Sequence, residues 1–104
     1  MRKLSDLKNV GKATLKDLAL LEINTVEELA LQNPTSLFHE LERLTQQRQD
    51  PCVWDVFAAI THEACTGDPT NWWDWTAQRK ELQKSGKLKH VIEKKPSISA
   101  ARDT

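Results

Sequence analysis

The sequence of 104 residues contains no tyrosine, only three glycines and two cysteines, and no long apolar run. A membrane-spanning helix needs about 20 consecutive apolar residues, so the sequence predicts none. The first ten residues, MRKLSDLKNV, have no apolar segment after their basic side chains, which a secretory leader would need. We therefore expect a soluble protein of the cytoplasm that does not bind membranes.

The two cysteines lie at opposite ends of one predicted helix. Asp50 is its expected cap, Pro51 lies in its first turn, Gly67 ends it, and apolar residues recur between them with helical spacing. Thirteen residues of helix would separate the Cα atoms of Cys52 and Cys65 by about 20 Å, whereas a disulfide requires about 7 Å or less. We expect two free thiols, which fit a reducing compartment.

Metal binding and catalysis find little support in the sequence. His62 and Cys65 are one helical turn apart, but a zinc site needs three or four ligands, and the other two histidines are distant in the chain. Asp55 and Glu63 lie on the same predicted helix as His62, yet there is no nucleophile motif and no further phosphate-binding glycine loop. We expect no enzymatic activity, no cofactor and no small-molecule substrate.

Helix caps and apolar spacing predict most of the remaining elements. Thr25 and Glu28 form a capping box before a short helix, and Asn33 with Pro34 starts a longer one. The apolar stripe of the longer helix is expected to bury Leu37, Phe38, Leu41 and Leu44. A further helix is predicted within residues 11–21, with the apolar positions Leu15, Leu18, Ala19 and Leu21.

A last helix is expected over residues 76–86. Thr76 is its predicted cap and Gly86 its predicted end, but Leu82 is almost its only interior apolar residue, so it must lean on another element. No alternating run of β-branched residues survives five positions, which argues against strands. The sequence therefore predicts an all-α bundle of five to six helices.

Three of the four tryptophans fall within the segment NWWDWT, residues 71–76. An indole buries on the order of 200 Å², so a small core can hardly leave three of them in water. We expect Trp73 and Trp75 to alternate inward from an extended segment and close the bundle, while Trp72 stays partly exposed. The expected structural residues are Trp54, Phe57, Trp73 and Trp75. A stacking surface for nucleobases is the alternative, although an acidic residue interrupts the cluster.

The chain is expected to divide into a helical domain, residues 1–86, and a basic, mostly flexible tail, residues 87–104. Apolar residues thin out after Gly86, and the sequence from about Pro96 holds too few to offset the entropy of the chain. Within this tail, residues 88–92 retain three apolar side chains, which predicts a short turn that docks on the domain.

Basic and acidic residues are equal in number, at 15 each, but unevenly distributed. Residues 1–20 carry five basic and two acidic residues (net +3), residues 21–71 carry two and nine (net −7), and residues 72–104 carry eight and four (net +4). The basic ends of the chain could bind phosphate and its acidic centre could bind a protein. The same distribution of charge also occurs on surfaces that contact only water. The acidic residues expected to face solvent or a protein include Glu40, Glu42, Asp50, Asp55 and Glu63.

The segment LSDLKNVGKATL contains a tight turn. Two leucines precede a break at Asn9, Val10 and Gly11, after which a helix begins at once. The turn resembles that of a helix-hairpin-helix motif, which reads glycine, hydrophobic, glycine, and Val10 and Gly11 match its last two positions. Asparagine replaces the first glycine, a mild departure because asparagine tolerates the left-handed conformation. Leu15 is a larger departure, because such motifs often have a small residue there.

A helix that starts directly after such a turn is suited to binding a phosphate. Its first amides have no partner within the helix, and the helix dipole adds partial positive charge there. Gly11 would let a phosphate approach, and nearby lysines would neutralise it. The predicted DNA-binding residues are Lys8, Asn9, Val10, Gly11, Lys12 and Lys16. Such binding is independent of base sequence and sensitive to salt; the alternative is a structural turn with solvated lysines.

Three stretches, NVGKATLKDLALLEINTVEELA, LTQQRQDPCVWDVFAAI and WWDWT, together resemble a bacterial family of small helix-hairpin-helix proteins. That family is labelled by a pathogenicity locus, and its members are sometimes called mitomycin resistance proteins. The resemblance covers about residues 4–80. LLEINTVEEL is also similar to part of the C-terminal domain of the RNA polymerase alpha subunit and to other five-helix folds of the sterile-alpha-motif type. The resemblance implies such a fold but no particular activity.

In such a fold, residues 44–51, LTQQRQDP, occupy the place of a second hairpin. This segment has no glycine, and Asp50 would repel a phosphate where Gly11 would admit one. We expect a structural turn there, with weak nucleic-acid binding through Arg43 and Arg48 as the alternative. Two functions thus remain open: a DNA-binding module that uses the first hairpin, or a protein-interaction module that uses the acidic centre and binds no nucleic acid.

Overall fold

The computed structural model describes residues 2–92, and all the regular secondary structure within them is helical. Five α-helices and two short 3₁₀ segments follow one another along the chain, which confirms the predicted all-α bundle. They are η1 (Leu4–Asp6), α1 (Lys12–Leu20), α2 (Val26–Ala30), α3 (Pro34–Thr45), α4 (Cys52–Thr66), η2 (Trp72–Trp75) and α5 (Thr76–Lys84). None of these helices has the length and apolar character needed to cross a membrane.

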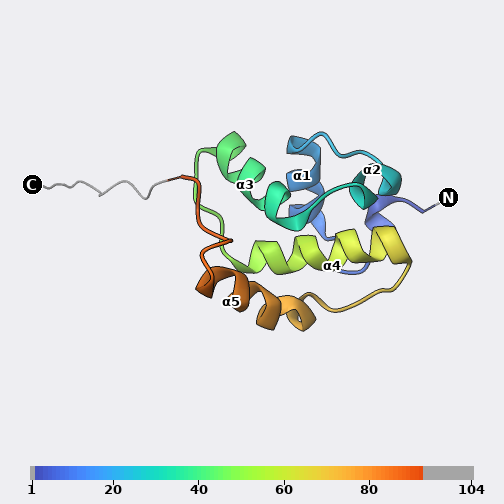
Figure 1. Cartoon of the computed structure of the whole chain (residues 1–104). Helices are drawn as coiled ribbons and strands as arrows, with labels where there is room; N and C mark the ends of the chain where they lie inside the picture. The colour runs from blue at the N-terminus through green and yellow to red at the C-terminus, as the bar shows by residue number, and fades with distance from the viewer. Residues whose placement is uncertain (1, 93–104) are drawn as a thin grey trace, which may run out of the picture.

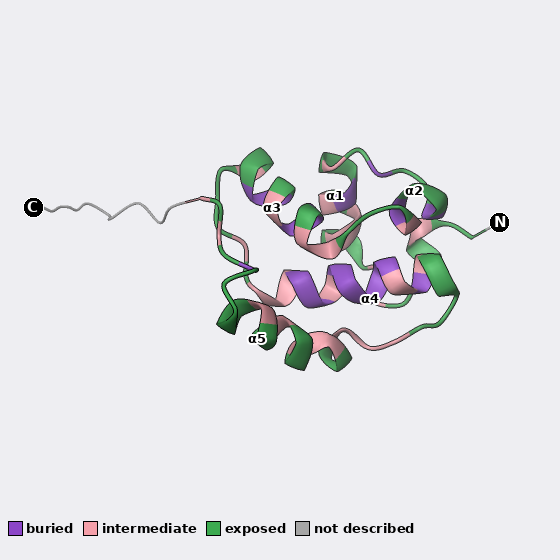
Figure 2. Ribbon diagram, viewed as in Figure 1, coloured by how far each residue is buried: buried purple, intermediate pink, exposed green. Residues whose placement is uncertain are grey.

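Helix α4 forms the centre of the bundle. Helices α1, α2 and α3 lie on one side of it and α5 on the other (Figure 1). Buried residues dominate α4, whereas α5 has none (Figure 2). Trp54 and Phe57 are among the buried residues of α4, as predicted. The core side chains contributed by the other segments include Leu7, Leu18, Ile23, Leu29, Phe38 and Leu41.

The predicted caps Thr25 and Asn33 are confirmed, whereas the N-cap of α4 is Pro51 and not the expected Asp50. The Thr25 hydroxyl accepts from the Glu28 amide at 3.0 Å, and the Glu28 carboxylate accepts from the Thr25 amide at 3.1 Å. Asn33 Oδ1 accepts from the amides of Thr35 and Ser36 at the start of α3. Gly67 ends α4 with φ 81°, a left-handed conformation that glycine adopts without steric cost.

Two predicted apolar positions are wrong. Leu44 is 50% exposed, because the buried face of α3 runs through Leu41 and Glu42 and leaves Leu44 on the flank. Ala19 is exposed too, since α1 buries only Leu18 fully and keeps Leu15 half-buried. In each case the helix was predicted correctly, but its buried face is narrower than the spacing of apolar residues indicated.

The tryptophan segment is a 3₁₀ turn rather than an extended strand, which corrects the expected orientation of Trp73. Residues two apart do not share a face in a 3₁₀ helix, so Trp73 does not point into the core beside Trp75. Trp75 packs on the core, and its Nε1 donates to Thr70 Oγ1 at 2.8 Å. Trp73 is 57% exposed, so it does not help to close the bundle.

Three carboxylates of α3 and α4 are buried, which corrects the expectation that the acidic centre faces outward. Glu42, Asp55 and Glu63 are at most 3% exposed, and only Glu40 and Asp50 of the five expected residues are exposed. A buried charge is costly unless it is paired. Each of the three accepts hydrogen bonds from a different peripheral segment, and the acidic centre is therefore not one continuous surface.

Asp55 fixes α5 to α4. Its carboxylate accepts from Arg79 Nε at 3.1 Å and from the Thr76 hydroxyl at 2.8 Å. Thr76 is therefore the first residue of the helix and not its side-chain cap, because its hydroxyl is directed at Asp55. This ion pair supplies the support that a helix with so few apolar residues needs.

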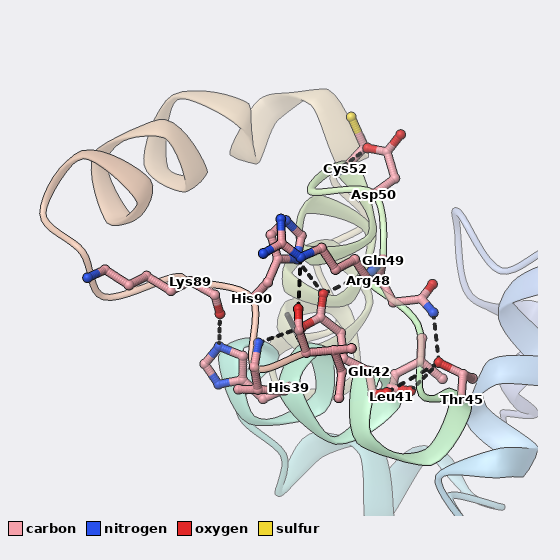
Figure 3. Close-up of polar contacts among 12 residues, drawn as sticks. His39, Leu41, Glu42, Thr45, Arg48, Gln49, Asp50, Cys52, Lys89 and His90 are labelled. Carbon is pink, nitrogen blue, oxygen red and sulfur yellow. Dashed lines mark hydrogen bonds and ion pairs between the residues drawn. The ribbon is translucent and has the colours of Figure 1, made fainter. Parts of the chain in front are cut away.

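Glu42 fixes the segment after α5 (Figure 3). Its carboxylate accepts from His90 Nδ1 and from the Val91 amide, the latter at 2.8 Å, while His39 Nε2 lies 2.8 Å from the Lys89 carbonyl oxygen. Leu88 is buried in the core. The turn expected at residues 88–92 thus docks on the bundle. The flexible tail expected from Pro96 lies outside the described residues.

Candidate nucleic-acid interface

The turn between η1 and α1 has the backbone conformation that its sequence predicts. Asn9 adopts φ 74°, the left-handed region in which a glycine is usual and asparagine is tolerated. Val10 follows, half-buried against the core, and its amide donates to the Leu7 carbonyl at 3.3 Å. The segment before the turn is a single 3₁₀ turn, and Leu7 anchors it in the core. Leu15 is half-buried and shares a groove with Leu4.

Glu63 holds this turn against α4. Its carboxylate accepts from the Lys8 amide at 2.8 Å and forms an ion pair with Arg2. Both contacts join residues more than 50 positions apart, and neither was predicted. The charge of Arg2 is therefore paired within the protein, whereas the Lys8 side chain is exposed to solvent.

Asn9 has a second role that the sequence did not indicate. Its Nδ2 donates to the Thr70 carbonyl at 2.8 Å, and its Oδ1 accepts from the Trp72 amide at 3.3 Å. One side chain therefore joins the hairpin turn to the tryptophan segment. The only sequence signal was the asparagine itself, because a glycine would satisfy the backbone but could not make these bonds.

Gly11 is exposed to solvent, and its backbone conformation does not require a glycine. Its φ of −103° and ψ of −169° are extended values that any residue adopts, and a Cβ built on it would meet no atom within 4 Å. Neither conformation nor packing therefore requires glycine here. What the missing side chain provides is an unobstructed approach to the start of α1.

The first turn of α1 presents amides that have no partner among residues 2–92. Gly11 is the N-cap and offers no side chain, and the first helical bond runs from the Leu15 amide to the Gly11 carbonyl at 2.9 Å. The free amides belong to Lys12, Ala13 and Thr14. Such amides, together with the helix dipole, favour an anion.

Three exposed lysines surround this helix start: Lys8, Lys12 and Lys16. No ion pair engages any of them within residues 2–92. The nearest acidic residue along α1 is Asp17, which is half-buried; burial raises the pKa of its carboxyl, and Lys16 opposes that rise. All six predicted DNA-binding residues therefore lie on or next to one turn, with basic side chains free to meet phosphate.

In the connection between α3 and α4, which occupies the expected place of a second hairpin, several polar groups are bonded within the protein. The Gln49 amide donates to Glu42 Oε2 and the Cys52 amide to Asp50 Oδ1, each at 2.9 Å. Arg48 Nε donates to the Ile92 carbonyl at 2.8 Å. Arg43, at the end of α3, pairs with Glu40 at 3.1 Å. Carboxylates of the protein itself therefore occupy the amides of Gln49 and Cys52, although the charge of Arg48 has no ion-pair partner within residues 2–92.

The other candidate groups are scattered. His62 Nε2 lies 3.2 Å from Asp68 Oδ2, and its ring centroid is 5.2 Å from that of Trp75. Cys52 and Cys65 are both free, and burial raises the pKa of the Cys52 thiol, with the Asp50 carboxylate adding to the rise. Within residues 2–92, no three His, Cys, Asp or Glu side chains are grouped so that they could hold a metal ion.

Comparisons with known proteins match most of the helical bundle. The family model Cdd1, described as a pathogenicity locus, matches residues 1–81. The mitomycin resistance protein McrB of Streptomyces lavendulae is 28% identical over 79 residues, which cover 76% of this chain and 75% of that protein. No solved structure shows significant similarity to the chain. Because the family match spans the bundle from its first residues into α5, the chain belongs to the Cdd1 pathogenicity locus family.

Proposed function

We propose that this protein is a non-enzymatic helix-hairpin-helix module that binds DNA weakly and without sequence specificity. The observation that carries the proposal is the start of α1, where unpartnered amides of Lys12 to Thr14 lie beside Gly11, which has no side chain, and exposed lysines. In this proposal, η1 and α1 are the two helical segments of the hairpin. In this proposal Lys8, Lys12 and Lys16 contact phosphate through their side chains, and Gly11 leaves room for it to approach. Asn9 and Val10 shape the turn, because the Asn9 side chain and the Val10 amide are bonded within the protein.

The expected affinity follows from the number of phosphates that one turn can neutralise. Two neutralised phosphates correspond to a slope of about −1.8 in log affinity against log salt concentration. Contacts to phosphate carry no information on base sequence. A single hairpin should therefore bind weakly at physiological salt, and a partner that contributes further contacts would raise the affinity.

The carboxylates on which the alternative functions depend are paired within the fold. Asp55 and Glu63, the acid-base candidates near His62, are buried in ion pairs. Glu42, one of the five residues expected on an acidic docking surface, is also buried and bound to His90. Neither an acid-base site nor an acidic docking face is therefore favoured over the hairpin.

The test is a titration of the ¹⁵N-labelled protein with a short DNA duplex at low salt, followed by NMR. The amide signals of Val10, Gly11 and Lys12 should shift, and the shifts should fade as salt is added because phosphate contacts are screened. Unchanged signals for these three residues at low salt would exclude the proposal.

Lys12→Glu separates binding from folding. Glutamate at the first position of a helix interacts favourably with the helix dipole, so this variant should fold at least as stably as the parent while repelling phosphate. Lys84→Glu makes the same change of charge on an exposed lysine at the end of α5 and is the matched control. DNA affinity should fall for the Lys12 variant and change little for the Lys84 variant.

A further inference from the structure

Trp73 is the one aromatic residue among the large apolar side chains that are exposed within residues 2–92, and it is 57% accessible. An exposed indole of this size leaves apolar area in water that the core could have used. The fold does not need it there, since Trp54 and Trp75 already pack on the core. Its exposed ring is therefore available to a ligand that an aromatic face can bind.

The tryptophan is held in a fixed orientation. The ring of Trp72 meets that of Trp73 edge to face, with centroids 5.5 Å apart and planes at 83°. The turn beneath them is closed by a reciprocal cap, in which the Asn71 amide donates to Asp74 Oδ2 at 3.0 Å and the Asp74 amide to the Asn71 carbonyl at 3.1 Å. Asp74 is thus tied back to the chain, and little entropy remains to be lost when a ligand stacks on Trp73.

This aromatic pair lies next to the hairpin. Asn9, at the centre of the hairpin turn, binds the backbone of both Thr70 and Trp72, so the segment that carries the pair is joined to the turn directly. Lys8, the neighbour of Asn9, is exposed and has no ion-pair partner within residues 2–92. The exposed tryptophan and the exposed Lys8 therefore belong to two segments that are bonded to each other.

We propose that Trp72 and Trp73 form a base-stacking platform, which makes single-stranded DNA the favoured ligand of this surface. The proposal rests on the proposed function and adds the class of DNA. Proteins that bind single strands combine aromatic faces with a basic track for the backbone. An unpaired base can lay its face on Trp73 while its phosphate meets the lysines, whereas a paired base has both faces covered by its neighbours.

The test compares fluorescein-labelled (dT)15 with a duplex of the same length by fluorescence anisotropy at low salt. The parent protein should bind (dT)15 more tightly than the duplex. Trp73→Ala should weaken (dT)15 binding by roughly 5- to 150-fold, the range expected for loss of one stacked base. It should leave duplex binding unchanged, and Trp73→Phe should retain most of the affinity for (dT)15 because it keeps an aromatic face.

The two proposals fail in different ways. Duplex binding that equals or exceeds (dT)15 binding, or (dT)15 binding that Trp73→Ala leaves unchanged, would overturn the stacking platform while the hairpin proposal stands. Binding to (dT)15 that depends on Trp73 but resists Lys12→Glu would support the platform and count against the hairpin. If the protein binds neither (dT)15 nor the duplex, both the stacking platform and the hairpin proposal are overturned. An unchanged melting temperature of Trp73→Ala shows that the exposed side chain is not needed for folding.

Discussion

The turn before α1 and the connection between α3 and α4 share a backbone conformation but present different polar groups to solvent. Asn9 and Gln46 both adopt left-handed conformations, with φ of 74° and 55°, and neither is a glycine. After Asn9 the chain enters a helix whose first amides have no partner within residues 2–92. After Gln46, the amides of Gln47, Gln49 and Cys52 have acceptors within the protein. The backbone conformation of a turn therefore does not decide whether it can bind a phosphate.

What differs is the acidic residue nearby. At the first turn Glu63 accepts from the Lys8 amide, before the helix starts, and leaves the amides of α1 untouched. At the second connection Glu42 accepts from Gln49 and Asp50 accepts from Cys52, so carboxylates already occupy the place that an anion would take. The first turn is open to a ligand and the second is closed by the protein itself.

The largest expected effect comes from opening the closed connection. Glu42→Ala removes the buried carboxylate and leaves His90 and the amides of Gln49 and Val91 without their acceptor. The free energy of unfolding should fall by about 3–5 kcal/mol, as for other buried pairs that lose one partner. Urea unfolding measures it. Glu40→Ala, on the exposed side of the same helix, should cost less than about 0.5 kcal/mol; equal losses would contradict the assignment.

Protonation of Glu42 should lower the free energy of unfolding by less than Glu42→Ala does. Burial alone would raise the pKa of Glu42, but hydrogen bonds from His90, Gln49 and Val91 outweigh it and hold the pKa below its usual value of 4.5. Folding thus favours the ionised form, so its contribution to stability is complete above pH 4.5 and is lost as the pH falls through the lower, folded-state pKa. The stability difference between the parent and Glu42→Gln should shrink over that range in urea titrations at successive pH values.

Asn9 tests the open turn. Asn9→Gly keeps the left-handed backbone but loses the bonds to Thr70 and Trp72, which should cost about 1–2 kcal/mol. Asn9→Ala loses the same bonds and adds the strain of an ordinary residue at φ 74°, for a total of about 2–3 kcal/mol. Thermal unfolding of the two variants separates the terms. Identical melting temperatures would show that the backbone of this turn carries no strain.

The smallest expected effect concerns Gly11. Gly11→Ala should change the free energy of unfolding by no more than about 0.5 kcal/mol, because the backbone is extended and the added methyl group meets open space. Gly67→Ala is the matched control, since its φ of 81° should make the same change cost about 1–2 kcal/mol. If DNA approaches the start of α1 as proposed, Gly11→Ala should still lower DNA affinity, measured by anisotropy.

Local patterns predicted the helices, because each depends on residues within a few positions of one another. The capping box at Thr25, the cap at Asn33, the stop at Gly67 and the left-handed Asn9 all follow from such short-range chemistry. The tryptophan segment was predicted to be extended, with alternate residues facing inward. It is a 3₁₀ turn, in which residues three apart share a face.

The buried carboxylates could not be predicted in the same way. A glutamate on an apolar helix is normally a surface residue, and its partner here lies far along the chain: Lys8 for Glu63 and His90 for Glu42 are separated by 55 and 48 positions. The candidate site shows the same limit. Its residues were predicted from one stretch, but the link from Asn9 to Trp72, 63 positions away, was not.

The three buried carboxylates have a consequence for how the molecule opens. Glu63 holds the N-terminal segment, Asp55 holds α5 and Glu42 holds residues 88–92, and no peripheral segment is shared between two of them. Detachment of a segment therefore costs its own anchor and its own core contacts, such as those of Leu7 or Leu88, while the apolar contacts among α2, α3 and α4 stay closed. Native-state hydrogen exchange should then divide the protein into three units of partial unfolding around one slowly exchanging centre.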